Sequence, residues 1–334
     1  MKVLLSWPVD KDLSQAISDA ANQAEALREM AHLEMTFLRN EEEWFERCGE
    51  ASVMLNPRIS LPRYPEFLRR AQKLEMIQTS SIGYDHIDIA ACTVAGVIVC
   101  NVAEIMAEIT SQHAWAIILD ISKNVTRSDR FLRGAGWLPP KRFGIGLYGK
   151  TLGIIGLGDI GGRVAVKGSL AFGMKVLAYD PYVLPEHAQL YNAHLVDLET
   201  LLRESDVVSI NCPLTSETRH LLGPQQLRLL KPTAILVNAA RGGIVDENAL
   251  IEVLRKEEIF GAGLDVFENE PLSSTSPLRK LENVVLTPHI GSSTGEVFNS
   301  TWKAAVENIL RYVKGERPYW IVNPSAVNVR RLHL

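Results

Sequence analysis

Short apolar runs alternate with amphipathic segments from the start of the chain. Apolar runs that predict strands lie at residues 3–5, 35–38, 52–55, 74–78 and 97–100. Segments that predict helices lie between them at 13–31, 41–48, 66–73 and 88–95. Alternating strands and helices favour a parallel sheet that is covered on both faces. We therefore expect a small α/β domain in the first hundred residues.

A second alternating series begins near residue 150. Its predicted strands are 152–155, 176–179, 194–196, 207–210, 235–238, 261–266 and 284–286, and its clearest helices end near Ala171 and Ser205. A long helical pattern at 103–124 joins the two series. The polar, basic stretch 122–133 and the following Gly-rich and Pro-rich segment predict a loop. A last helix is expected at 295–313, with a tail that packs back on the first domain.

The first strand of the second series runs directly into a glycine-rich turn. Gly156, Gly158 and Gly161 form the pattern Gly-x-Gly-x-x-Gly between this strand and a helix that Gly173 ends. The first glycine permits the tight turn, the second lets the backbone approach a pyrophosphate at the helix N-terminus, and the third allows close packing of helix on strand. The alternative is a glycine-rich turn in an ordinary βαβ unit, but strand, helix and a following acid are all present.

The acid at the end of the next strand indicates which dinucleotide binds. Asp180 follows the turn by roughly 20 residues, where a carboxylate can accept hydrogen bonds from both hydroxyls of an adenosine ribose. A 2′-phosphate at this place would be repelled by the carboxylate. Pro181 and Tyr182 come next, so no Arg or Lys is there to receive a phosphate. The sequence therefore predicts NAD (NADH) rather than NADP.

Polar side chains follow the later strands of the same series. Cys212, Arg241, Asp265, Glu270 and His289 span almost eighty residues of sequence, yet each comes at or just after a predicted strand end. The carboxyl ends of parallel strands lie along one edge of a sheet, and ligands bind in the crevice outside that edge. We therefore expect these five side chains to converge beside the dinucleotide.

Three of these residues suit hydride transfer to or from a 2-oxo acid. The side chain of His289 has an ordinary pKa near neutrality, so it can act as an acid toward a carbonyl and as a base toward an alcohol. A carboxylate such as Glu270 would orient the ring and favour its protonated form. Arg241 offers a planar fork that fits a carboxylate. Taken singly, such residues are often structural; together at a nucleotide-binding edge they predict catalysis.

Composition and cysteine content limit the partners and the cellular location that we expect. The 334 residues are 46% hydrophobic and 22% charged with a net charge of −4, so no nucleic-acid or membrane partner is expected. The N-terminal apolar run is too short for a signal peptide, and no stretch is long enough to span a membrane. Its four cysteines, Cys48, Cys92, Cys100 and Cys212, form no C-x-x-C pair. These features favour reduced thiols and a cytoplasmic location.

The motifs together resemble the D-isomer-specific 2-hydroxyacid dehydrogenase family over nearly the whole chain. The motifs that carry the resemblance are Gly-Leu-Gly-Asp-Ile-Gly with Asp180, Asn-Cys-Pro-Leu-Thr at 211–215, Val-Asn-Ala-Ala-Arg-Gly-Gly at 237–243, Leu-Asp-Val-Phe-Glu-Asn-Glu-Pro at 264–271 and Thr-Pro-His-Ile-Gly at 287–291. The segment from Trp137 through Pro139 or Pro140 to Gly144 and Leu147 is similar to glyoxylate and hydroxypyruvate reductases. An aromatic anchor in a dimer arm is an equally good interpretation of Trp137.

The resemblance implies a role for each matching residue. Arg241 would bind the substrate carboxylate and keto oxygen, Glu270 would pair with His289, and His289 would donate the proton to the keto group. Asp265 would hydrogen-bond the nicotinamide carboxamide. The full set that would contact the cofactor is Gly156, Gly158, Asp159, Ile160, Gly161, Asp180, Cys212, Pro213, Thr218, Ala239, Ala240, Arg241, Asp265, His289, Gly291 and Ser292. No metal is expected.

The resemblance also implies an architecture. A Rossmann NAD-binding domain, residues 102–290, would be inserted into a flavodoxin-like substrate domain made of residues 1–101 and 291–334, with the substrate in the cleft between them. Ile82 and Gly83 would offer backbone N–H groups to the substrate carboxylate, although a plain strand-to-helix turn explains this loop as well. A homodimer is expected. Met106 and Gln112 stand where the family usually has polar or acidic residues.

We therefore predict NADH-dependent reduction of a small 2-oxo acid such as glyoxylate or hydroxypyruvate to a D-2-hydroxy acid. Two alternatives share the fold. One is a phosphite dehydrogenase-like enzyme, which would need a lysine where this chain has Ile82. The other is a corepressor-like protein in which NAD binding serves partner recruitment; such proteins carry long flexible tails, whereas this chain ends soon after its last predicted helix.

Overall fold

Two compact units make up the protein. The computed structural model describes residues 2–6, 34–38, 40–57, 59–135, 137 and 143–329. One unit comprises residues 1–106 and 294–334, and the other comprises residues 107–293. The helix predicted at 13–31 lies outside the described residues, as do Pro139 and Pro140.

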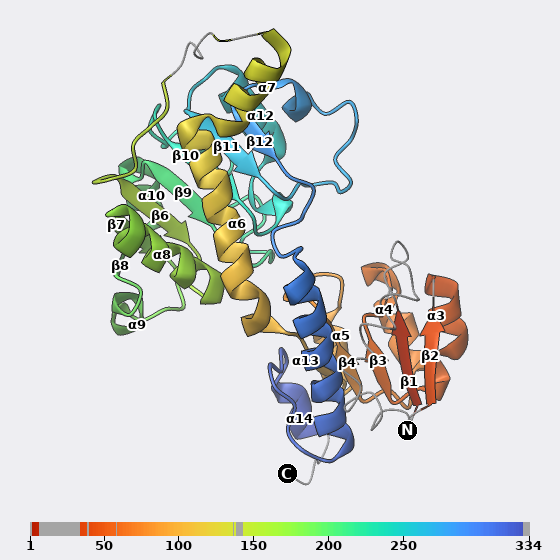
Figure 1. Ribbon diagram of the computed structural model, residues 1–334. Coiled ribbons are helices and arrows are strands. Elements are labelled where there is room, and N and C mark those ends of the chain that lie inside the picture. The colour runs from red at the N-terminus through yellow and green to blue at the C-terminus, as the bar shows by residue number, and fades with distance from the viewer. Residues whose placement is uncertain are drawn as a thin grey trace. The chain divides into compact units, whose positions relative to one another are not determined.

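The first unit contains a five-stranded sheet in the order β2-β1-β3-β4-β5, and every neighbouring pair is parallel (Figure 1). This is the flavodoxin-like strand order, as predicted. The strands are β1 (Lys2–Ser6), β2 (Glu34–Leu38), β3 (Val53–Leu55), β4 (Met76–Gln78) and β5 (Ile98–Cys100). Their side chains alternate between two cores, since Met54 and Ile77 belong to one cluster and Val53 and Met76 to the other.

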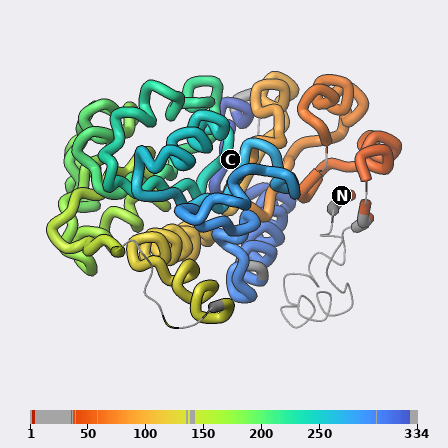
Figure 2. The backbone as a smooth tube through the Cα atoms, turned by 90° about the horizontal axis from the view of Figure 1, so that it is seen from above, coloured from red at the N-terminus to blue at the C-terminus, as the bar shows by residue number. Residues whose placement is uncertain are grey.

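Helices from both ends of the chain cover this sheet. They are α3 (Glu41–Arg47), α4 (Tyr64–Arg70), α5 (Ile89–Val94), α13 (Gly295–Val313) and α14 (Ser325–Val329). Figure 2 shows the blue helix α13 beside the orange N-terminal elements, where Ala305 and Ile309 pack against strand residues. The Asn323 side chain accepts a hydrogen bond from the Val99 amide at 2.8 Å. The tail therefore packs on the first unit, as the sequence predicted.

The second unit contains a seven-stranded, fully parallel sheet in the order β12-β11-β10-β9-β6-β7-β8. Counted from β6, this is the doubly wound order of a Rossmann fold, in which the strand order reverses between β6 and β9. The strands are β6 (Thr151–Ile155), β7 (Lys175–Tyr179), β8 (Ala193–Leu195), β9 (Val207–Ile210), β10 (Ile235–Asn238), β11 (Gly261–Leu264) and β12 (Val284–Leu286). Both predicted fold classes are therefore confirmed.

Two helical layers enclose this second sheet (Figure 1). The helices are α6 (Ala103–Lys123), α8 (Asp159–Phe172), α9 (Pro185–Gln189), α10 (Leu198–Glu204), α11 (Pro224–Leu227) and α12 (Glu247–Arg255). On one face, Trp115 of α6 stacks on Phe172 of α8 with ring centroids 4.2 Å apart. None of the described helices, α6 included, is long and apolar enough to cross a membrane.

The predicted loop at 122–133 is wrong, because helix α7 (Val125–Ala135) occupies most of it. Asn124 has a left-handed φ of 54°, which ends α6 and redirects the chain. The Asp120 carboxylate then accepts a hydrogen bond from the Thr126 amide at 2.7 Å and caps the new helix. An Arg133–Asp129 ion pair at i,i+4 spacing adds support. The stretch is polar on average, and its large apolar side chains Val125 and Leu132 are exposed, which is why the sequence favoured a loop.

Helix α6 contacts the sheet at Gly263, where an added Cβ would collide with the side chains of Ile117 and Ile121. We expect Gly263→Ala to destabilise the second unit by about 2 kcal/mol through overpacking and to lower its melting temperature by about 5 °C. The matched control is Gly146→Ala, where a Cβ meets no atom within 4 Å. Thermal unfolding followed by circular dichroism measures both. Equal melting temperatures for the two variants would contradict this packing.

Candidate active site

The glycine-rich turn lies between β6 and α8, at the carboxyl edge of the seven-stranded sheet. Gly156 has a φ of 88°, and a Cβ there would lie 2.6 Å from the Cys212 amide nitrogen. A Cβ on Gly161 would collide with the Gly156 carbonyl, whereas a Cβ on Gly158 would meet no atom within 4 Å. The first and third glycines are therefore required by close packing. The second leaves open space at the N-terminus of α8, where a phosphate is favoured.

Asp180 is tied to this turn by hydrogen bonds. Its Oδ2 accepts from the Leu157 amide at 2.9 Å, and its Oδ1 accepts from the Tyr182 amide at the same distance. Both bonds come from backbone donors within the glycine turn and the β7 loop. The carboxylate is thereby fixed at the carboxyl end of β6, with lone pairs left for a further donor.

The loop after β9 forms the other side of the turn. Thr218 Oγ1 donates to the Pro213 carbonyl at 2.6 Å, which holds this loop closed. Burial raises the pKa of the Cys212 thiol to about 11. Cys212 is therefore protonated at neutral pH and is not a nucleophile.

The Arg241 segment follows β10 and is shaped by Asn238. The Asn238 side chain accepts from the Ala240 amide at 3.0 Å and donates to the Arg241 carbonyl at 2.9 Å. Gly242 lies so close to the backbone of Phe267 that a Cβ there would collide with it. The structure therefore brings the Arg241 segment against the loop that carries Glu270.

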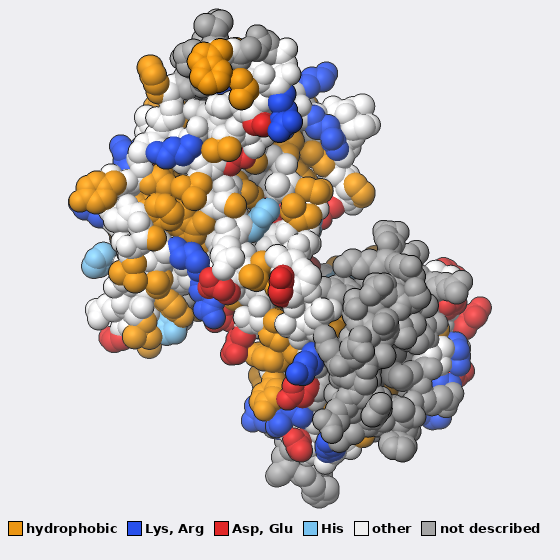
Figure 3. Space-filling model, in the orientation of Figure 1, with side chains coloured by type: hydrophobic (Ala, Val, Ile, Leu, Met, Phe, Trp, Pro, Cys, Tyr) orange, Lys and Arg blue, Asp and Glu red, His pale blue; other side chains and the backbone are white. Residues whose placement is uncertain are grey.

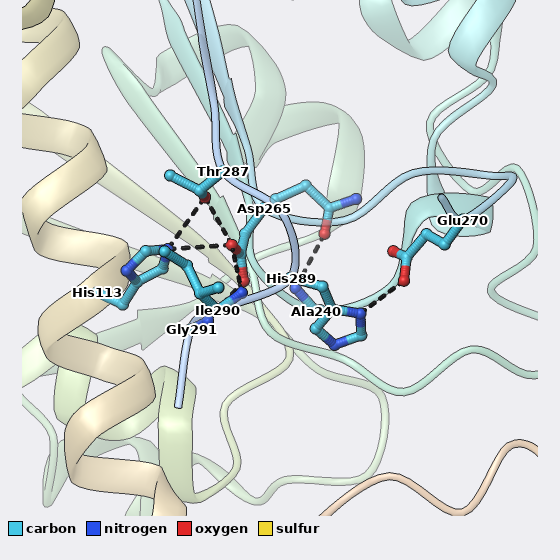
Figure 4. A network of polar contacts seen from close by, with 9 residues as sticks. His113, Ala240, Asp265, Glu270, Thr287, His289, Ile290 and Gly291 are labelled. Carbon is cyan, nitrogen blue, oxygen red and sulfur yellow. Dashed lines mark hydrogen bonds and ion pairs between the residues drawn. The ribbon is translucent and has the colours of Figure 1, made fainter. Parts of the chain in front are cut away.

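Glu270 and His289 form a direct pair (Figure 4). Glu270 Oε2 lies 2.7 Å from His289 Nδ1, and Glu270 Oε1 accepts from the Phe267 amide at 3.0 Å. An ionised carboxylate only accepts hydrogen bonds, so Nδ1 carries a proton and Nε2 is the nitrogen that can exchange one. The His289 side chain is 49% exposed. This geometry orients the ring and leaves it open to a reactant.

A buried carboxylate shapes the turn that carries His289. Asp265 is 1% exposed, and Figure 4 shows it beside the segment from Thr287 to Gly291. Its Oδ1 accepts from the Thr287 hydroxyl at 2.6 Å and the Ile290 amide at 2.9 Å, and its Oδ2 accepts from the Gly291 amide at 2.8 Å. The Asp265 carbonyl also accepts from the His289 amide at 2.8 Å. This turn holds His289 at a left-handed φ of 53°.

His113 of α6 completes this network. Its Nε2 lies 3.2 Å from Asp265 Oδ1 and 3.2 Å from Thr287 Oγ1. Burial raises the pKa of Asp265, but hydrogen bonds from His113, Thr287 and the Ile290 amide outweigh it and hold the pKa below its ordinary value. The carboxylate is therefore ionised at neutral pH.

Comparison with known proteins decides the family. The family model described as "D-isomer specific 2-hydroxyacid dehydrogenase, NAD binding domain" matches residues 115–291. A glyoxylate reductase of Thermococcus litoralis is 43% identical over 269 residues, which cover 78% of this chain and 81% of that protein.

The chain belongs to the D-isomer-specific 2-hydroxyacid dehydrogenase family.

Solved structures agree with this membership. A D-lactate dehydrogenase from Aquifex aeolicus, complexed with NAD and lactic acid, is similar with a TM-score of 0.79 and 28% identity, over 98% of each chain. An acyclic imino acid reductase in complex with NADPH and D-Arg is similar with a TM-score of 0.81 and 26% identity, over 96% of this chain and 100% of that one. This dehydrogenase is accordingly an enzyme, an oxidoreductase with an NAD-binding domain.

The sequence did not single out His113 or Thr287 as part of this dehydrogenase's site. A signal for His113 was present, because it lies four residues from both Ile109 and Ile117 in the apolar stripe of its helix. A histidine in a core-facing stripe needs a polar partner. The identity of that partner, Asp265, depends on the contact between α6 and the carboxyl edge of the sheet, which the sequence pattern does not specify.

The predicted substrate loop lies in the first unit of the dehydrogenase. The Ile82 carbonyl accepts from the Asn101 side chain at 3.0 Å, and the Gly83 carbonyl accepts from the Ser81 hydroxyl at 2.8 Å. Within the described ranges, the Ile82 and Gly83 amides donate to no protein acceptor. The loop thus has its carbonyls paired, while two amides remain available.

We expect Asp265→Asn to lower the stability of this dehydrogenase at pH 7 by about 1–3 kcal/mol, because the introduced NH2 would face a backbone donor in a buried site. The folded pKa of Asp265 is below its ordinary value, so its stabilisation is present at neutral pH and is lost as pH falls from about 4 through the folded pKa. Wild type should therefore lose stability between pH 7 and pH 3.5 that Asp265→Asn does not lose.

Urea unfolding at the two pH values measures this difference. The matched control is Asp129→Asn, which removes an exposed ion pair and should change stability by less than about 1 kcal/mol. If Asp265→Asn and Asp129→Asn lowered the free energy of unfolding equally at pH 7, the proposed role of the Asp265 hydrogen bonds in holding the His289 turn would be contradicted.

Proposed function

We propose that this enzyme reduces a small 2-oxo acid, such as glyoxylate or hydroxypyruvate, to the D-2-hydroxy acid with NADH as the reductant. The observation that carries the proposal is the His289–Glu270 pair, with 2.7 Å between Nδ1 and Oε2, at the carboxyl edge of an NAD-binding sheet. The T. litoralis relative is named a glyoxylate reductase, which supports a small substrate. The overall change is 2-oxo acid, NADH and a proton to 2-hydroxy acid and NAD⁺.

In this proposal, His289 is the proton donor. When bound, the reduced nicotinamide supplies the hydride to C2 of the substrate. His289 Nε2 gives its proton to the keto oxygen, and the Glu270 carboxylate on Nδ1 stabilises the charged ring before transfer. Arg241 binds the substrate carboxylate and polarises the keto oxygen with its planar guanidinium. In the reverse direction, the same nitrogen accepts the proton of the alcohol.

The cofactor assignment rests on Asp180. We infer that its remaining lone pairs accept from the adenosine ribose hydroxyls and that the carboxylate disfavours a 2′-phosphate. Asp159, Ile160 and the glycines of the turn would hold the pyrophosphate, and the loops after β9, β10 and β12 would line the rest of the cofactor. Contact between Asp265 and the nicotinamide carboxamide remains a prediction. Both carboxylate oxygens of Asp265 already accept hydrogen bonds from the protein itself.

In this proposal, one unit binds the cofactor and the other binds the substrate. The unit of residues 107–293 would be the cofactor domain, and the unit of residues 1–106 and 294–334 would be the substrate domain. Ile82 and Gly83 would donate their amides to the substrate carboxylate, which is consistent with the absence of other acceptors for them in the described residues. Asn56 supports this loop, because its side chain bonds both the Ser80 amide and the Ser80 hydroxyl at 2.8 Å.

A homodimer is part of the same proposal. Hydrophobic side chains are exposed at many places on the surface of the second unit in Figure 3. In and after α7, the large exposed hydrophobic residues are Val125, Leu132, Trp137, Phe143 and Tyr148. The most exposed, Phe143, is 92% exposed. Aromatic and aliphatic side chains in such numbers are typical of a protein interface, and a second copy of the chain would cover them.

A substrate panel tests the reaction. We expect NADH absorbance to fall when the enzyme meets glyoxylate or hydroxypyruvate, with slower turnover of pyruvate and of bulkier 2-oxo acids. Fluorescence titration confirms in the same sample that NADH binds. Folded, NADH-binding protein that turns over no 2-oxo acid would overturn the proposed function.

Removal of the proton donor tests the mechanism. We expect His289→Ala to lower kcat by about 10²- to 10⁴-fold, because general acid catalysis is lost, while NADH affinity changes little. His194→Ala is the matched control, since His194 is an exposed histidine of the same unit in β8. Equal losses of NADH affinity and kcat in His289→Ala would assign a structural role to His289.

A further inference from the structure

The loops on either side of the glycine turn are joined by one side-chain bond. Strands β7 and β9 both pair with β6, on its opposite edges. Tyr182 follows β7 and Glu217 follows β9, and the Tyr182 hydroxyl donates to Glu217 Oε2 at 2.8 Å. Contact with Glu217 raises the pKa of the Tyr182 hydroxyl, so the donor keeps its proton. This bond therefore spans the carboxyl end of β6.

Glu217 is held in a short, well-bonded turn. Thr218 Oγ1 accepts from the Thr215 amide at 2.7 Å and donates to the Pro213 carbonyl at 2.6 Å. The Glu217 amide donates to Thr215 Oγ1 at 3.2 Å. These bonds fix the backbone of the turn, and the Tyr182 hydroxyl is the contact that holds the exposed Glu217 carboxylate.

The contacts close into a ring around the end of β6. Asp180 accepts from the amides of Leu157 and Tyr182, the Tyr182 hydroxyl donates to Glu217, and the loop of Glu217 returns to Cys212, which touches Gly156. Both carboxylates are thus fixed by the same residue, Tyr182, one through its backbone and one through its hydroxyl. The adenosine end of a dinucleotide binds at this switch in strand order.

Charge in this ring is negative. Arg219 is the nearest cationic residue in the sequence. Its guanidinium lies toward Gly243, in the loop after β10, where a Cβ on Gly243 would be 3.7 Å from Arg219 Nη1. A 2′-phosphate would carry further negative charge to a loop pair that already holds two carboxylates, Asp180 and Glu217. Glu217 and Tyr182 are exposed, so this repulsion acts through water and is screened by salt.

We propose that Glu217, positioned by Tyr182, is a second specificity-determining residue that excludes 2′-phosphorylated dinucleotides from this enzyme. The inference rests on the proposed function and deepens it, since Asp180 alone was expected to select NADH. A relative of the same fold was solved with NADPH, so the fold itself does not fix this choice.

The test compares NADH and NADPH binding by fluorescence titration, together with KM for each. Glu217→Gln keeps an acceptor for the Tyr182 hydroxyl and removes the charge. We expect it to raise the NADPH-to-NADH affinity ratio about fivefold, and we expect this gain to shrink in 1 M salt because the repulsion is screened. Tyr182→Phe keeps the charge of Glu217 but removes the hydrogen bond that positions it. Its increase in the NADPH-to-NADH affinity ratio should therefore be smaller than that of Glu217→Gln.

Glu204→Gln is the matched control. Glu204 ends α10, which leads into the start of β9, so it lies toward the opposite edge of the sheet, and its removal should leave the ratio unchanged. If Glu217→Gln left the ratio at the wild-type value, or weakened both cofactors equally, Glu217 would be structural and this inference would be overturned. If wild type bound no NADH at all, the proposed function itself would fail.

Discussion

The buried Asp265 carboxylate is the constraint on which the catalytic geometry depends. It stands at the end of β11 and receives donors from α6 and from the turn after β12, so three elements distant in sequence meet on two oxygen atoms. An ionised group in such a place is stable only when its bonds are complete. The His289 turn must therefore adopt one conformation, including a left-handed backbone at His289, and that conformation presents the ring to Glu270.

The parallel sheet explains why the glycine turn and the proposed catalytic residues lie on one edge. Each strand of the second unit leads into a loop on the same side, so the glycine turn after β6, the Arg241 segment after β10 and the His289 turn after β12 lie along one edge of the sheet. Close approach of backbones then fixes their spacing. Gly156 lies against Cys212 and Gly242 lies against Phe267, and neither contact tolerates a side chain.

Most strands and helices could be predicted because the apolar pattern that indicates each one lies within its own short stretch of sequence. Strands β9, β10 and β12 and helix α13 begin and end where the apolar pattern and its flanking polar residues indicated. Helix α7 was missed because its stretch is polar on average and its large apolar side chains Val125 and Leu132 are exposed. Strand β11 ends at Leu264, two residues before the predicted end at Val266.

The sequence named candidate site residues but not the contacts that hold them. Family motifs named Arg241, Glu270 and His289, and strand order placed them on one edge. The partnership of His113 with Asp265 and the bond between Tyr182 and Glu217 join residues more than 30 positions apart, and they depend on how a helix and two loops pack. Such contacts leave no periodic pattern in the sequence, so only the three-dimensional arrangement reveals them.

The stereochemistry of the product tests the central claim most directly. Reduction of hydroxypyruvate with NADH creates a chiral centre at C2, and chromatography on a chiral phase separates the two glycerate enantiomers. Membership of the D-isomer-specific family, with the proposed role of His289 as proton donor, predicts D-glycerate alone. Formation of L-glycerate, or of both enantiomers in equal amounts, would contradict it.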